Sequence, residues 1–97
     1  MTAERAHAYR RVMHTLNELG PSKLVGPEQE RIRHAVDTLI FSRDLLEDAA
    51  AREALQDMER LCGALVDSGR WQQESATRLA TEISQCGPPP PAELEAA

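Results

Sequence analysis

The sequence lacks the features of a secreted or membrane-spanning protein. It has two cysteines among 97 residues, too few for a disulfide framework. No apolar run approaches the roughly 20 residues that a helix needs to cross a bilayer, and the first residues contain no apolar core of a secretory signal. We therefore expect a cytoplasmic protein with free thiols and no membrane partner.

Motifs of the common catalytic folds are also missing. There is no G-x-S-x-G, no glycine-rich phosphate loop and no H-E-x-x-H. Glu4 with His7, and Glu30 with His34, have the spacing of one helical face, but a carboxylate-bridged metal site needs two E-x-x-H pairs and two further carboxylates. We predict no catalytic residue, no cofactor and no metal. A small helical enzyme or metal-binding bundle is one alternative.

Positive charge is scarce. The net charge is −5, and only residues 1–25 have an excess of basic side chains, four against two acidic ones. Phosphate contacts dominate the affinity of proteins for nucleic acids, so this balance argues against a nucleic-acid partner. Arginine outnumbers lysine ten to one, which we attribute to a GC-rich bacterial genome.

The residues that are abundant indicate an all-α protein. Hydrophobic residues make up 41% and charged residues 28%, as in ordinary soluble domains. Alanine, leucine, glutamate and arginine dominate, and all four favour helices. We predict one domain over residues 1–87, a small antiparallel bundle of three or four helices, followed by a disordered, proline-rich acidic tail over 88–97.

Periodic apolar residues place the first two helices. The first is expected over 3–19, because Gly20 suits the position after a helix and Pro21 stops its continuation. The second is expected over 27–46, with Pro27 in its first turn.

The second half of the chain predicts two more helices. One is expected over 49–67, with Asp48 as its N-cap and Ser68–Gly69 as its end, and another over 72–86. Periodicity alone does not decide whether residues 41–48 turn or continue as a helix, but the Asp48 cap favours a tight turn near 46–48.

The two cysteines are expected to be unpaired. In an antiparallel pair of helices, Cys62 and Cys86 would lie on the order of 12 Å apart along the axis, whereas a disulfide needs Cα atoms within about 7 Å. Cys62 falls on an apolar stripe and is predicted to be core, and Cys86 is predicted to be the more exposed of the two.

The segment around the only tryptophan has two interpretations. Residues 60–85 loosely fit a helix-turn-helix of a DNA-binding regulator, but Arg70 and Arg78 are the only basic residues in 61–97. The interpretation that we favour is a structural corner, in which Trp71 folds back over the seam between two helices.

Large apolar residues outside the regular stripes point to a protein partner. Leu39 and Phe41, with Ile40 between them, cannot all face inward on one helix, and Trp71 and Arg70 occupy the opposite end of the next helix pair. Aromatic and arginine side chains are enriched at interfaces. We therefore predict a homodimeric, non-catalytic interaction module that acts as a small bacterial adaptor or regulator and binds another protein or itself. Its candidate interface comprises Leu39, Phe41, Arg70 and Trp71.

Overall fold

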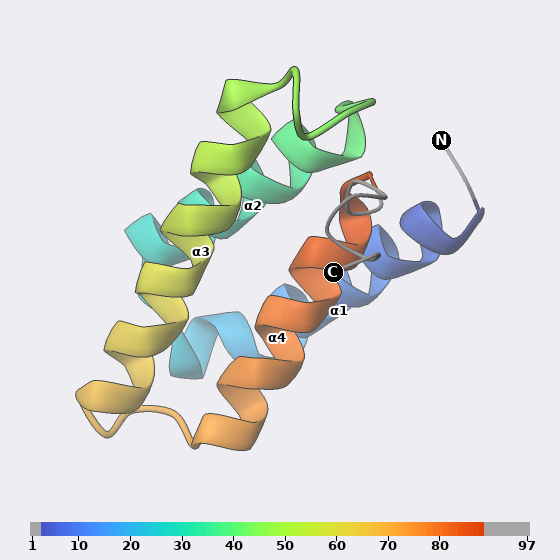
Figure 1. Cartoon of the computed structure of the whole chain (residues 1–97). Coiled ribbons are helices and arrows are strands. Elements are labelled where there is room, and N and C mark those ends of the chain that lie inside the picture. The colour runs from blue at the N-terminus through green and yellow to red at the C-terminus, as the bar shows by residue number, and fades with distance from the viewer. Residues whose placement is uncertain (1–2, 89–97) are drawn as a thin grey trace.

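Four helices make up most of the part of the chain that the structure describes, residues 3–88, apart from the side chains of 19–22. In this computed structural model they are α1 (Ala3–Lys23), α2 (Gly26–Ile40), α3 (Ala49–Asp67) and α4 (Gln73–Cys86) (Figure 1). The predicted all-α fold is confirmed. The predicted tail lies outside the described residues from residue 89 onward.

The helices form an antiparallel bundle in which the first and last are neighbours. α1 packs against α2 and α4, and α3 packs against the same two helices (Figure 1). α2 and α4 also touch, whereas α1 and α3 do not. α1 and α3 therefore lie on opposite sides of the α2–α4 pair. None of the helices in residues 3–88 combines the length and apolarity that crossing a bilayer requires.

The core is built from the apolar residues that recur every three or four positions along each helix. All four helices contribute to it, together with Leu24 from the α1–α2 connection and Trp71 from the α3–α4 connection. The largest fully buried side chains are Val12, Leu16, Ile32, Val36, Leu39, Met58, Leu65, Leu79, Ile83 and Cys86.

α3 has the bounds that the sequence predicts. The Asp48 carboxylate accepts a hydrogen bond of 3.0 Å from the backbone N–H of Ala51, which caps the helix. This bond, aided by the nearby Ser42 hydroxyl, holds the pKa of Asp48 below its usual value. At the other end Gly69 adopts φ = 77°, the left-handed conformation that glycine tolerates.

α1 ends four residues later than predicted, because it continues through Gly20 and Pro21 to Lys23. Proline has no backbone N–H and costs the helix one bond. The Lys23 carbonyl, however, accepts hydrogen bonds from Trp71 Nε1 at 3.1 Å and Arg70 Nη2 at 3.2 Å. These donors, 47 and 48 residues away in the chain, stabilise a helix end that local sequence signals do not indicate.

α2 ends six residues earlier than predicted. Phe41 is its C-cap, and residues 41–48 form a connection of turns and bends that includes the predicted turn at 46–48 but begins well before it. The Ser42 N–H bonds back to the Leu39 carbonyl at 3.1 Å, and the Arg5 side chain also donates to the carbonyls of Leu39 and Ile40. The predicted helix over 27–46 is therefore wrong beyond Ile40.

Candidate functional site

The four candidate interface residues do not form one surface. Leu39 is fully buried and Trp71 is 8% exposed, so both belong to the core. Phe41 is 80% exposed at the end of α2, and Arg70 is exposed at the far end of the bundle. Of the four, only Phe41 presents a large apolar side chain to solvent.

The segment around Trp71 is a structural corner. After α3 the N–H of Gly69 bonds to the Val66 carbonyl at 3.0 Å, and the N–H of Arg70 bonds to the Leu65 carbonyl at 3.1 Å. This pattern is the Schellman motif, which satisfies the last carbonyls of a helix. The Trp71 ring is buried beyond it, as the corner interpretation requires.

Arg70 is held by an ion pair across the corner. Its Nη1 and Nη2 donate to the two Glu28 carboxylate oxygens at 2.8 and 2.9 Å, a bidentate arrangement. The Arg70 guanidinium holds the pKa of Glu28 below its usual range. One of the two arginines in residues 61–97 is therefore already engaged within the chain.

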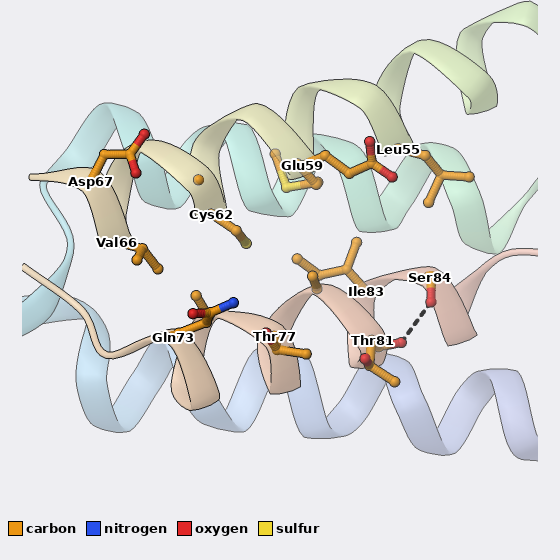
Figure 2. Close-up of a pocket in the computed structure, with 14 residues that line it drawn as sticks. Leu55, Glu59, Cys62, Val66, Asp67, Gln73, Thr77, Thr81, Ile83 and Ser84 are labelled. Atoms are coloured by element: carbon orange, nitrogen blue, oxygen red, sulfur yellow. Dashed lines mark hydrogen bonds between the residues drawn. The ribbon is translucent and has the colours of Figure 1, made fainter.

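An open groove with a volume of about 560 Å³ lies between α3 and α4. Its floor is apolar, and it is flanked by hydroxyl, amide and carboxylate groups (Figure 2). In Figure 2, Leu55, Cys62 and Val66 extend from α3 toward α4, with Val66 at the Gln73 end of the groove and Leu55 at the Ser84 end. The lining residues are Leu55, Met58, Glu59, Cys62, Gly63, Val66, Asp67, Gln73, Ala76, Thr77, Ala80, Thr81, Ile83 and Ser84.

Gly63 lies in this groove in the middle of α3. A Cβ atom at this position would meet no atom within 4 Å, so neighbouring side chains do not require glycine. Glycine inside a helix costs about 1 kcal/mol relative to alanine. Among the described residues, no steric contact accounts for the glycine.

The cysteine in the groove does not have the properties of a reactive nucleophile. Cys62 lies in its floor, and burial raises the pKa of its thiol, which disfavours the reactive thiolate. Cys86 was predicted to be the more exposed cysteine, and this is wrong: it is 0% exposed, and burial raises its pKa to about 11. The last turn of α4 is covered because α1 and α2 both pack against this helix.

The carboxylate–histidine pairs are not gathered into a metal site. Glu30 and His34 line a hollow between α2 and α3 together with Glu53 and Asp57. The Asp57 carboxylate there is bound by Arg31 at 2.7 and 3.2 Å. Within residues 3–88, no group of three or more metal-binding side chains is close enough to hold an ion.

Arg5 is an organising residue that sequence reasoning missed. Its Nη2 donates to the carbonyls of Leu39 and Ser42, each at 2.7 Å, and to that of Ile40 at 3.3 Å. Its Nε donates to the Cys86 carbonyl at 3.0 Å. One guanidinium from α1 thus binds the C-terminal ends of both α2 and α4, where helix dipoles favour a cation. No local signal marks Arg5, because its partners lie 34 to 81 residues away.

Sequence reasoning also missed the groove, although Gly63 inside an otherwise regular helical pattern was a usable signal. The sequence and the structure were also compared with known proteins. No family model matches the sequence, and no significant match was found among curated proteins or among solved structures.

Proposed function

We propose that the chain is a non-catalytic helical module that binds other proteins, and that the α3–α4 groove receives part of the partner. The observation that carries the proposal is the groove itself, an open hollow of about 560 Å³ with an apolar floor and a polar rim. Burying apolar surface drives most protein association, and an apolar centre within a polar rim is the usual anatomy of an interface.

Gly63 supports this use of the groove. A glycine that lowers helix stability, and that no internal contact requires, is explained when a partner approaches the backbone closely. The α4 wall opposite contains the small residues Ala76 and Ala80, which also allow a close approach. Both walls therefore leave room for another chain.

A selection with displayed peptides tests the proposal. A library of helical peptides, randomised along one face, is selected on the wild-type chain and then counter-screened on Gly63→Leu. The new Cβ meets no atom within 4 Å, and the leucine adds bulk at a residue that lines the groove. Ala64→Leu is the matched control, because Ala64 is the next residue of α3, is exposed and does not line the groove.

We expect enriched peptides that bind wild type and Ala64→Leu equally and bind Gly63→Leu at least about tenfold more weakly, which corresponds to about 1.4 kcal/mol. Peptides that bind Gly63→Leu as tightly as wild type, or a selection that enriches no peptide, would overturn the proposal. Circular dichroism of both leucine variants shows that the helices are retained.

Self-association is a second proposal, supported by the exposed apolar side chains of the α2–α3 connection. Phe41 is 80% exposed and Leu46 is 61% exposed, and exposed large apolar side chains that occur together mark interaction surfaces more often than single ones do. A homodimer through this connection predicts a concentration-dependent mass in light scattering, and Phe41→Ser should shift it to the monomer. A monomer mass for wild type at every concentration would contradict it.

The setting that we propose is a bacterial cytoplasm, where the chain would act as a small adaptor or regulator. The arginine-rich composition and the two free cysteines support this setting. Export of the chain to an oxidising compartment in its native host would contradict it.

A further inference from the structure

The geometry of the α3–α4 groove points to one kind of occupant, a single amphipathic helix of about three turns with basic residues along its flank toward α3. This inference rests on the function proposed above and specifies the partner of the same groove. Three properties of the groove support it. The backbone groups in the helix interiors that form its walls are already paired, the groove has a defined length, and its charges are unevenly distributed.

A helix suits this groove better than an extended segment. Both walls are helices, whose interior N–H and C=O groups are already paired within α3 and α4. An extended peptide in the groove would therefore lose water from its own backbone without gaining a ladder of hydrogen bonds, which is costly. A helix satisfies its backbone internally and needs only an apolar stripe to contact the floor.

The length of the groove sets the length of the occupant. Along α3 the lining runs from Leu55 to Asp67, and along α4 from Gln73 to Ser84. At 1.5 Å per residue each wall is about 18 Å long. A helix lying along the groove would therefore contact it over about 12 residues, or three turns.

The charges on the rim are of one sign. Glu59 and Asp67 are exposed on the α3 side, and among the described residues no lysine or arginine lines the groove. They are eight residues apart, about 12 Å along the axis. The α4 side offers neutral groups from Gln73, Thr77 and Thr81 (Figure 2). Lysine or arginine residues two turns apart on one flank of the occupant would match the two carboxylates.

The acidic rim is a local property and does not simply reflect the net charge. On the other side of α4, the hollow against α1 is lined by Arg10, Arg11 and Arg78, with Glu82 as its only acidic residue. Glu82 there lies 3.4 Å from Arg11. The two sides of α4 therefore carry opposite charge, and only the α3–α4 side combines acidity with the apolar groove.

The test uses peptides from the selection described above, with lysine, glutamine and glutamate all allowed at the flanking positions. One selected peptide is then synthesised in two forms, with lysine or with glutamate at two flanking positions seven residues apart. Binding is measured by fluorescence anisotropy against wild type, the double variant Glu59→Gln with Asp67→Asn, and Glu74→Gln. Glu74 is the charge control, because it is an exposed acidic residue outside the groove lining.

We expect enrichment of lysine over glutamate at the flank and about tenfold tighter binding of the lysine form, since exposed charge pairs contribute up to about 1 kcal/mol each. This preference should disappear in the double variant and in 0.5 M salt, where the Debye screening length falls to a few ångströms. It should persist in Glu74→Gln. Peptides that bind in a Gly63-dependent manner without any charge preference would overturn this inference and leave the proposed function intact. If no selected peptide binds Gly63→Leu more weakly than wild type, both this inference and the proposed function are overturned.

Discussion

Replacing Arg5 with methionine removes a cation that holds two helix ends together. The guanidinium is half-buried, and its Nε and Nη2 bind the carbonyl groups of Leu39, Ile40, Ser42 and Cys86. Methionine retains most of the apolar length of the side chain and removes every donor. The variant therefore measures the hydrogen bonds with little change in packing.

The expected loss of stability follows from the two Arg5 nitrogens that donate hydrogen bonds, Nε and Nη2. A hydrogen bond that involves a charged group contributes about 1.5–3 kcal/mol, and three of the carbonyls share Nη2, so we count one bond for each nitrogen. Because the site is only partly buried, we expect the lower end, a loss of about 3 kcal/mol. In a domain of this size that loss lowers Tm by about 12–24 °C.

Urea denaturation followed by circular dichroism provides the measurement. Arg5→Lys should retain about half of the stabilisation, because a single ammonium cannot donate to both helix ends as the forked guanidinium does. Arg10→Met is the control on the same helix, since Arg10 is exposed and no hydrogen bond or ion pair is found for it among the described residues. If Arg5→Met costs less than about 1 kcal/mol, or no more than Arg10→Met, the role assigned to Arg5 is refuted.

Three further predictions concern the glycines, the buried thiol and acid stability. Gly63→Ala should raise the free energy of unfolding by about 1 kcal/mol, whereas Gly87→Ala should lower it by about 1 kcal/mol or more, because its Cβ would lie 3.0 Å from Cδ2 of the buried Leu39; equal effects in urea denaturation would contradict this contrast. In a Cys62→Ala variant, a thiol reagent at pH 8 should modify Cys86 only as fast as the protein unfolds, since this thiol is buried and its pKa is raised to about 11; rapid stoichiometric labelling of the native protein would contradict its burial. The pKa values of Glu28 and Asp57 are lowered, chiefly by hydrogen bonds from Arg70 and Arg31, so their contribution is present above the ordinary carboxyl pKa and is lost as pH falls through the lowered values. Denaturation between pH 6 and about pH 2 should show a shallower loss of stability in Glu28→Gln with Asp57→Asn than in wild type; an unchanged slope would argue against both pairs.

Helix ends set by neighbouring residues were predictable, and those set by distant residues were not. Asp48 and Gly69 cap α3 through bonds within a few residues, and the predicted bounds of this helix are correct. The end of α1 depends on donors from the Trp71 corner, and the end of α2 depends on Arg5. Propensity and turn signals describe only the local chain, so they placed both of these ends wrongly.

The candidate site was predictable only in part. Composition predicts a helical fold, and the burial of Cys62 follows from its place on an apolar stripe. The sequence could not show that Leu39 is buried while Phe41 is exposed, because the burial of each residue depends on where α2 ends. The groove depends on how far α3 and α4 lie apart, which no pattern within either helix specifies.

The pairing of α1 with α4 has a consequence during synthesis. α1 leaves the ribosome before α4 but needs α4 as its neighbour, and the Arg5 bond to Cys86 spans 81 residues. At about 5–20 residues per second, the 63 residues between the end of α1 and the end of α4 take about 3–13 seconds to be made. During that interval the apolar stripe of α1 has no complete core to enter. Nascent chains of this protein should therefore depend on holding chaperones until α4 emerges.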